Sequence, residues 1–296
     1  MTSRKLILGT RESKLAMRQA EMVQEQLSLA GIEVEIKGIT SEGDKDRVRP
    51  LYELGVQGIF TRTLDAALLS KEIDIAVHSM KDMPVQLAKG IQQAAVLKRA
   101  SPYDILVYAK HYDAAKVQRI GSSSIRRKAQ WLNKFPQHQV LPIRGNVDTR
   151  LLKLEDGEFD AVVFAEAGLD RINLKPANYT LLDWMVPAPA QGAILVVCRE
   201  GDEALNLCRR INDEETSQCV YAERSFLKRL DGGCSEPVAA LARIAGDEVH
   251  FTGGVYSQDG KRKMEIQLTD SRANSATIGL RAADELLAQG VKDLLE

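Results

Sequence analysis

The sequence predicts two α/β lobes followed by a small α+β domain, and three observations lead to this fold class. As far as Cys198, short apolar runs rich in β-branched residues alternate with stretches of helical periodicity, which is the pattern of βαβ units. An apolar run at 193–198 follows the proline-rich linker VPAPAQG, which predicts a strand that crosses back into the first sheet, so that two lobes enclose a cleft. From Asp213 on, alternating segments are separated by glycine-containing turns, which favours an antiparallel sheet. The predicted domains are residues 1–98 with 191–212, residues 99–190, and residues 213–296.

In the first lobe, predicted strands and helices alternate. The strands cover residues 5–8, 32–39 and 73–77, and the helices cover residues 12–29 and 59–69. Gly31 ends the first helix, and Pro84 ends any helix that follows the third strand. The polar string HSMKDMP therefore follows a strand of the predicted sheet.

The second lobe repeats this alternation, and the C-terminal part departs from it. Strands are predicted at ILVY after Asp104, at 119–121, at 140–143 and at 161–164. A helix then runs to Leu230, followed by strands in ALARIAG, EVHFTGGVY and KMEIQLT and by a closing helix at 282–287. This last part predicts a small α+β domain.

Composition excludes several classes of protein. The chain has 296 residues, 44% hydrophobic and 27% charged, with a net charge of -1, so nothing global indicates a nucleic-acid partner. The N-terminal apolar run is too short for a signal peptide or a membrane span, which predicts a cytoplasmic protein without a membrane partner. The four cysteines and four histidines lack metal-ligand spacing, so we expect no metal site and no structural disulfide.

Positive charge is concentrated in one segment of this nearly neutral chain. Between residues 116 and 153 there are nine basic residues, and Asp148 is the only acidic one. A solvated basic face is the ordinary interpretation of such a cluster. The positions favour anion binding instead, because GSSSIRR and LPIRGNVDTR each place arginines where a strand passes into a helix. Arginine predominates over lysine at these two corners, which suits bidentate binding of carboxylate or phosphate.

The first lobe offers a further corner and an acid. LGTRES is either an anion seat or ordinary helix capping, and the Lys81 and Asp82 pair in HSMKDMP is either a polar surface loop or an acid at the end of a parallel strand. AQGA at 190–193 is typical of a hinge or tight turn. Cys234, on the glycine-flanked loop DGGCSEP, is the best candidate for a covalent role, although an inert exposed thiol is also consistent with the pattern.

Seven strings occur in order along residues 4–240: LGTRES, DIAVHSMKDMP, GSSSIRRKAQ, IRGNVDTRLLKL, AGLDRI, PAPAQGA and AERSFLKRLDGGCSEP. Together they resemble the motifs of the porphobilinogen deaminase family, also called hydroxymethylbilane synthases. The resemblance implies two lobes of the type II periplasmic-binding-protein kind and a third domain that carries a cofactor.

The resemblance also implies an activity. Members of this family join four porphobilinogen molecules head to tail, release ammonia each time, and form hydroxymethylbilane for tetrapyrrole and heme biosynthesis. The implied cofactor is one dipyrromethane per chain, bound through a thioether to Cys234. A monomer is expected, with the product passed to uroporphyrinogen-III synthase. The carboxylate-bearing substrate and product fit the clustered arginines.

Site residues follow from the same resemblance, motif by motif. Asp82 is implied as the catalytic group that assists loss of ammonia, faces the resulting cation and accepts the proton lost after bond formation. The implied cofactor-binding residues, besides Cys234, are Ser79, Lys81, Ser122, Ser123, Ser124, Arg126, Arg127, Arg144, Gly145 and Arg150. The implied substrate-binding residues are Arg11, Ser13, Phe60, Arg171 and Gln191.

Four positions depart from the family pattern, and other classes of protein stay in view. Gln57 replaces a frequent lysine, Glu166 a small or apolar residue, and Ala190 a frequent glycine, while Ser122 replaces the usual threonine conservatively. A non-catalytic anion-binding protein of the periplasmic type would share the lobes but has no use for the DGGC loop. A one-component regulator would need a helix-turn-helix segment, and none is apparent.

Overall fold

The computed structural model describes residues 5–40, 61–110, 112–232 and 236–295. These residues fall into two compact units, and each is described by itself. The first unit contains residues 5–40, 61–100 and 192–217, and the second contains the remaining described residues from Ser101 to Gln191 and from Gln218 on. The second unit holds two of the three sheets, so the division into two units does not test the predicted boundaries of three domains. Those boundaries stay a prediction.

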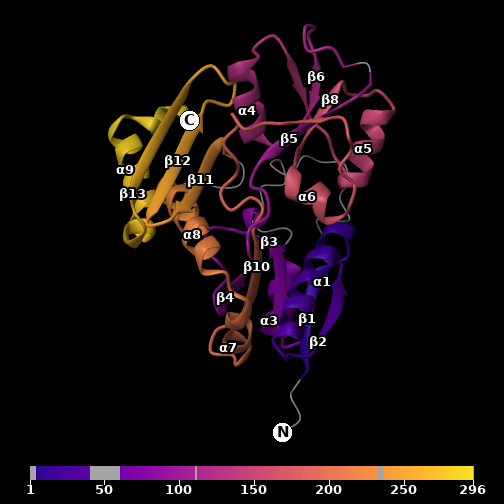
Figure 1. Ribbon diagram of the computed structural model, residues 1–296, viewed down its shortest axis with the longest axis vertical. Coiled ribbons are helices and arrows are strands. Elements are labelled where there is room, and N and C mark those ends of the chain that lie inside the picture. The colour runs from indigo at the N-terminus through magenta and orange to yellow at the C-terminus, as the bar shows by residue number, and fades with distance from the viewer. Residues whose placement is uncertain (1–4, 41–60, 111, 233–235, 296) are drawn as a thin grey trace. The chain divides into compact units, whose positions relative to one another are not determined.

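The first unit is a five-stranded sheet in the order β2-β1-β3-β10-β4 (Figure 1). Its strands are β1 (Leu6–Arg11), β2 (Val34–Ile39), β3 (Ile75–Ser79), β4 (Ile91–Val96) and β10 (Ile194–Arg199). Its helices are α1 (Lys14–Leu29), α3 (Arg62–Leu69) and α7 (Ala204–Cys208). β1 pairs in parallel with β2 and β3, whereas β10 runs antiparallel to both β3 and β4. The predicted return of the 193–198 segment to the first sheet is thus confirmed.

The second unit begins with a sheet of the same strand order, β7-β6-β8-β5-β9. Its strands are β5 (Asp104–Tyr108), β6 (Arg119–Gly121), β7 (Gln139–Leu141), β8 (Ala161–Ala165) and β9 (Tyr179–Leu181). Its helices are α4 (Ile125–Lys134), α5 (Val147–Glu155) and α6 (Glu166–Arg171). The antiparallel strand β5 takes the place that β10 takes in the first sheet.

Both faces of the second sheet are covered, which explains the unbroken apolar run of β8. Val162 and Phe164 pack into the core that α5 and α6 share, and Ala161 and Val163 pack with Trp131 of α4 on the other face. Strands buried on both faces read as continuous rather than alternating apolar segments. The two sheets have the same strand order with one reversed strand each, which confirms the predicted type II periplasmic-binding-protein-like lobes.

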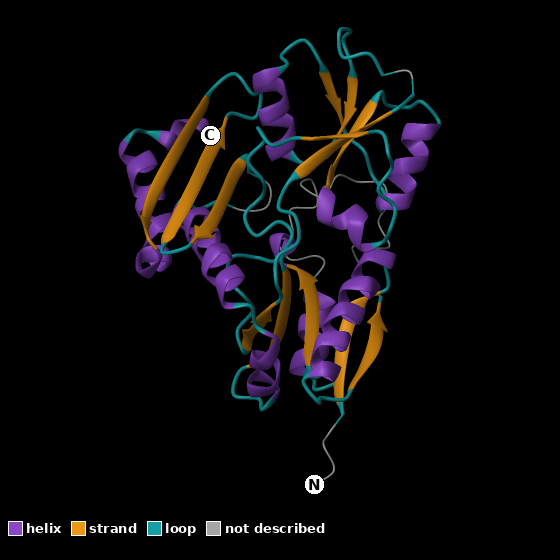
Figure 2. Ribbon diagram, in the orientation of Figure 1, coloured by secondary structure: helices purple, strands orange, loops and turns teal. Residues whose placement is uncertain are grey.

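The third sheet is antiparallel and follows α8 (Glu214–Arg229), as Figure 2 shows in the colours for strand and helix. It contains β11 (Val238–Ala245), β12 (Glu248–Tyr256) and β13 (Lys263–Ser271), and α9 (Ser275–Ala288) closes the fold. The predicted α+β part with an antiparallel sheet is confirmed. In the described part of the chain, no helix has the length and apolarity needed to cross a membrane.

Candidate active site

The carboxyl ends of two neighbouring parallel strands gather the predicted residues of the first lobe. Arg11 is the last residue of β1, Ser79 is the last residue of β3, and a short 3-10 helix, Met80–Asp82, follows directly. Ligands of α/β proteins bind at such strand ends. Arg11, Ser79 and Asp82 line a pocket of about 40 Å³ together with Gln19 and His78. This volume is little more than that of one water. The pocket therefore shows only where these side chains converge.

Two predicted serines of the first lobe form hydrogen bonds with residues of α1. The Nε2 of Gln19 lies 2.9 Å from the hydroxyl of Ser79, which fixes that side chain at the strand end. The hydroxyl of Ser13 accepts a hydrogen bond from the backbone N–H of Ala16 at 3.3 Å and so caps α1. Ser13 thus has the capping role that its motif left open, and its role toward substrate stays a prediction. Asp82 is exposed, and its carboxylate has no partner among the described residues.

His78 is the buried titratable group of this pocket. Burial, and to a lesser extent the positive charge of Arg11, lowers the pKa of His78 to about 4. The imidazole is therefore neutral at neutral pH, and its Nε2 has no hydrogen-bond partner in the described structure. His78 was not among the residues that the motifs implied, although it directly follows the predicted strand at 73–77.

In the second lobe, the two predicted strand-to-helix corners are neighbours. β6 and β7 pair in parallel, so GSSS and IRGN leave the same edge of the sheet. The hydroxyl of Ser123 joins them, because it donates to the carbonyl of Ile143 at 2.7 Å and accepts from the N–H of Ile143 at 2.9 Å. Ser124 caps α4 by accepting from the N–H of Arg127, and Ser122 accepts from the N–H of Ser124. The three hydroxyls therefore shape the corners, and their predicted contact with an anion stays a prediction.

The second corner is a tight glycine turn. Gly145 has a φ of 109°, and a β-carbon at this position would lie 2.6 Å from the side chain of Thr149. Its carbonyl accepts a hydrogen bond from the Nε of Arg150 at 2.8 Å, which orients that guanidinium beside the turn. Arg144 lies between β7 and this turn. Arg144, Gly145 and Arg150 thus lie at one strand-to-helix corner, as the motif predicted, and their contact with a cofactor stays a prediction.

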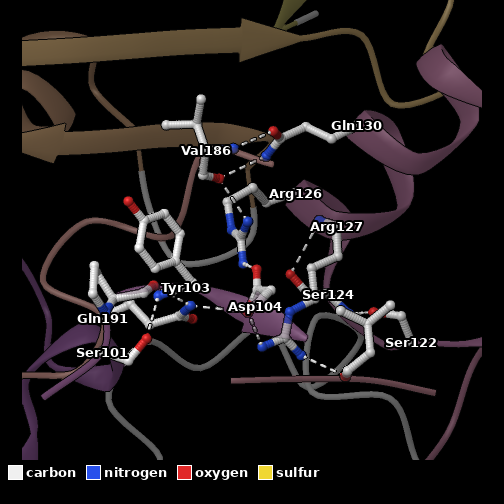
Figure 3. A network of polar contacts seen from close by, with 12 residues as sticks. Ser101, Tyr103, Asp104, Ser122, Ser124, Arg126, Arg127, Gln130, Val186 and Gln191 are labelled. Carbon is white, nitrogen blue, oxygen red and sulfur yellow. Dashed lines mark hydrogen bonds and ion pairs between the residues drawn. The ribbon is translucent and has the colours of Figure 1, made fainter. Parts of the chain in front are cut away.

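Arg126 and Arg127, in the first turn of α4, are buried and share one carboxylate (Figure 3). The Nη2 of Arg126 lies 2.7 Å from Oδ2 of Asp104, and the Nη2 of Arg127 lies 2.7 Å from Oδ1. Sequence reasoning missed Asp104. The available signal was an acidic residue opening the otherwise apolar run ILVY. Its partners lie 22 and 23 residues further on, so local sequence did not reveal the contact.

The remaining predicted residues fall into two groups. Arg171 ends α6, where burial lowers its pKa to about 10 and leaves it charged at neutral pH. Gln191 is fully buried and donates from Nε2 to the carbonyl of Pro102 and to Asp104, each at 2.8 Å. Phe60 and Cys234, together with Gln57, lie outside the described residues.

The concentration of positive charge is smaller in space than along the sequence. At least five of the nine basic residues form ion pairs with acids outside the segment: Lys116 with Asp113 at 3.4 Å, Arg119 with Asp160 at 2.8 Å, Lys153 with Glu158 at 3.9 Å, and Arg126 and Arg127 with Asp104, each at 2.7 Å. A count along the chain does not include these partners. At the first corner two arginines share the single carboxylate of Asp104, so this pair keeps a surplus of positive charge.

Two of the departures from the family pattern find a structural explanation. The carboxylate of Glu166 accepts hydrogen bonds from Lys175 at 2.7 Å and from Ser101 at 2.5 Å. The positive charge of Lys175 therefore balances the negative charge of Glu166. Although burial alone raises it, these two hydrogen bonds lower the pKa of Glu166 overall. Ala190 has a φ of 63°, a left-handed conformation that favours glycine, and its N–H donates to buried Glu223 at 2.6 Å.

The fold and these strand ends define a two-lobed α/β protein with an accessible carboxylate in one lobe and a cluster of arginines in the other. Comparison with known proteins is more specific. Residues 6–207 match the family model "Porphobilinogen deaminase, dipyromethane cofactor binding domain", and residues 217–288 match "Porphobilinogen deaminase, C-terminal domain". The chain belongs to the porphobilinogen deaminase family.

Curated relatives agree over the whole length. The porphobilinogen deaminase of Listeria innocua is 42% identical, over 99% of this chain and 98% of its own. The porphobilinogen deaminase of Syntrophotalea carbinolica is 40% identical, over 100% of this chain and 96% of its own. That of Trichlorobacter lovleyi is 38% identical, over 100% of this chain and 97% of its own.

Proposed function

We propose that this chain is a transferase that joins four porphobilinogen molecules head to tail, releases ammonia each time, and yields hydroxymethylbilane. The observation that carries the proposal is the match of both family models and of the curated relatives over almost the entire chain. A non-catalytic anion-binding protein shares the two lobes, but such a protein gains nothing from a carboxylate such as Asp82 beside the pocket.

The second lobe fits a carboxylate-bearing cofactor such as the dipyrromethane for which the family model is named. Arg126 and Arg127 share one carboxylate, and the Nε atom of each is buried without a partner in the described structure. This leaves surplus positive charge and unused donors, which an acetate or propionate group would satisfy. When bound, the dipyrromethane supplies the primer from which the product is extended.

The residues proposed to hold this cofactor come from both lobes and from the C-terminal part. Cys234, outside the described residues, is the proposed thioether attachment. The carboxylate ligands are proposed to be Lys81, Arg126, Arg127, Arg144 and Arg150, with Ser79, Ser122, Ser123, Ser124 and Gly145 lining the same site. Substrate is proposed to contact Arg11, Ser13, Phe60, Arg171 and Gln191.

Asp82 is the proposed catalytic residue because its carboxylate is accessible at the end of β3. It gives a proton to the departing amino group as the C–N bond breaks and ammonia leaves. Its negative charge then stabilises the cation left on the substrate. After the new C–C bond forms, the same carboxylate accepts the proton that the pyrrole carbon loses, which restores its protonated state. Arg11 binds a substrate carboxylate at the neighbouring strand end.

The cellular setting is proposed on the same basis. We expect a cytoplasmic monomer whose product is passed to uroporphyrinogen-III synthase. Size-exclusion chromatography with light scattering tests the monomer, and a coupled assay with that synthase tests the transfer of the product.

The intact mass of the purified protein tests the proposed function. We expect a mass that exceeds the sequence by two porphobilinogen-derived pyrrole units, with peptide mapping locating the addition on Cys234. Cys234→Ser should remove the addition, whereas Cys219→Ser, a change at a buried thiol of α8, should keep it. If Cys234 stays unmodified even after incubation with porphobilinogen or hydroxymethylbilane, the anion-binding alternative is favoured instead.

A further inference from the structure

Asp104 is the centre of the polar network that holds the arginine pair (Figure 3). It opens β5, and its side chain is 0% exposed. Its two oxygens accept at least three hydrogen bonds from described residues, among them one from each arginine and one from Gln191. Burial of a lone carboxylate is unfavourable, so its position in the fold depends on these donors.

The network locks each guanidinium group at two points. Arg126 donates from Nη1 to the carbonyl of Val186 at 2.8 Å, and Arg127 donates from Nη1 to the carbonyl of Val163 at 3.0 Å. The second point for each is Asp104. Two consecutive helical residues point about 100° apart, so a shared carboxylate is what brings these two groups together. Since a guanidinium has five donors, each arginine keeps N–H groups that this network does not use.

The same network also fixes the chain segment that precedes β10. The carbonyl of Val186 accepts from Gln130 of α4 as well as from Arg126, and the N–H of Val186 donates to the Oε1 of Gln130 at 2.9 Å. Five residues further on, Gln191 donates to Asp104. The arginine pair therefore sits in a frame that is bonded on three sides: by β5, by the carbonyl of Val163 in β8, and by this segment.

We propose that Asp104 is a positioning residue that sets the geometry in which Arg126 and Arg127 meet the carboxylates of the dipyrromethane. This inference rests on the proposed function. Asp104 itself repels anions, so its presence beside an anion site is unfavourable if charge alone matters. Its value lies in orientation, because without it two adjacent buried cations repel each other and lose their common anchor.

Asp104→Asn distinguishes an effect of charge from an effect of position, because the two predict opposite changes in the rate at which the dipyrromethane is loaded. The substitution keeps the shape and raises the local positive charge by one. If charge alone governs assembly, apo-protein incubated with hydroxymethylbilane should acquire the dipyrromethane at least as fast as the parent. We expect the reverse: loading, followed by intact mass, slowed by about tenfold, the scale of one lost hydrogen bond to a charged group. Loading as fast as the parent or faster overturns the proposal.

Asp74→Asn is a matched control for an effect of stability alone. Asp74, in the first unit, is also a buried carboxylate, and it bonds Arg199 at 3.1 Å and the N–H of Ile7 at 2.9 Å. Asp74→Asn should lower the melting temperature, yet load at the parent rate. Equal slowing in both variants at matched melting temperature attributes the effect to stability and overturns the positioning role.

Two further outcomes keep the test decisive. If Asp104→Asn yields no folded protein, Asp104→Glu keeps the charge and shifts the oxygens by one methylene, and it should also slow loading, whereas parent-like loading overturns the proposal. If the parent protein itself never acquires the dipyrromethane on Cys234, the proposed function fails. A loaded parent with equally loaded Asp104 variants contradicts the positioning role alone.

Discussion

At the scale of single residues, the first-lobe pocket combines an accessible acid with a buried neutral base. Asp82 is exposed after β3, while His78, four residues earlier, is buried, and its Nε2 has no partner among the described residues. A protonated imidazole at that depth would add a second positive charge near Arg11. The pocket therefore holds His78 uncharged beside Arg11 and Asp82.

The burial of His78 predicts a loss of stability in acid. The pKa of His78 is about 4 in the folded protein against 6.5 unfolded, so below pH 6.5 the unfolded chain binds the extra proton first. Its contribution is full above pH 6.5 and is lost as the pH falls toward 4, by up to about 3 kcal/mol at 1.36 kcal/mol per pKa unit. Urea unfolding of the parent and of His78→Gln at pH 7, 6 and 5 checks this. A parallel pH dependence in the two proteins would contradict it.

Asp82→Asn should bind substrate and turn over orders of magnitude more slowly. The amide keeps the shape of the side chain but cannot exchange a proton or offset a developing cation. Steady-state kinetics on loaded protein should show a fall in kcat with little change in KM. Glu72→Gln, which breaks a surface ion pair with Lys37 in the same unit, is the control and should keep parent kinetics. Near-parent turnover of Asp82→Asn would reject the catalytic assignment.

The roles of single residues were predictable only where the residues lie in one short motif. The Ser123 and Arg150 corners were identified because glycine, serine and arginine occur together at a strand end. Asp104 was not, because its contact with Gln191 joins residues 87 positions apart. The ion pair of Arg119 with Asp160 was missed for the same reason, which is why the basic segment carries more net charge along the sequence than it does in space.

At the scale of elements, the C-terminal part depends on a close approach between two helices. A β-carbon on Gly279 of α9 would lie 1.9 Å from the backbone carbonyl oxygen of Ala222 in α8. A backbone atom cannot turn aside as a flexible side chain can, so the glycine sets the distance between the helices. Periodicity predicted the two helices, but it carries no information on how closely they pack.

Gly279→Ala should destabilise the protein although alanine is the better helix former. The gain in helix propensity is about 1 kcal/mol, and separating two packed helices costs more, so we expect a net loss of about 1–2 kcal/mol in the free energy of unfolding. Chemical denaturation measures it. Leu280→Ala, at the exposed neighbouring position, is the control and should change stability by less than about 0.5 kcal/mol. Increased stability of Gly279→Ala would contradict the close packing.

At the scale of the whole molecule, the second unit joins its two sheets through α4. Tyr256 of β12 is buried against Ala129 of α4, and the carbonyl of Gly260 in the following turn accepts from Asn133 at 2.7 Å. A β-carbon on Gly260 would lie 2.6 Å from the carbonyl oxygen of Ala129. A surface hollow of about 350 Å³ beside this turn contains none of the predicted site residues. The helix that carries the arginine pair is thus also the helix on which the third sheet rests.

Gly260→Ala should therefore lower the free energy of unfolding by more than the strain of the turn conformation alone. Gly246, in the other turn of the same sheet, also has a positive φ, but no described residue lies within 4 Å of the place that a β-carbon would take there. Gly246→Ala therefore measures backbone strain of about 1 kcal/mol. Gly260→Ala adds the clash with α4, and we expect a further loss of about 1–3 kcal/mol in denaturation experiments. Equal losses in both variants would mean that the turn does not press on α4.

The position of β10 has a consequence for how the chain is made. β10 lies between β3 and β4, yet the ribosome synthesises it only after the whole second lobe. Domains usually fold from the N-terminus as they emerge, but here the strands from β5 to β9 are complete while the first sheet still lacks its joining strand. We expect the second lobe to fold first. Until β10 is synthesised and inserted, the facing edges of β3 and β4 are open to pairing with other chains. The N-terminal lobe of the nascent chain is therefore the part that most needs a chaperone.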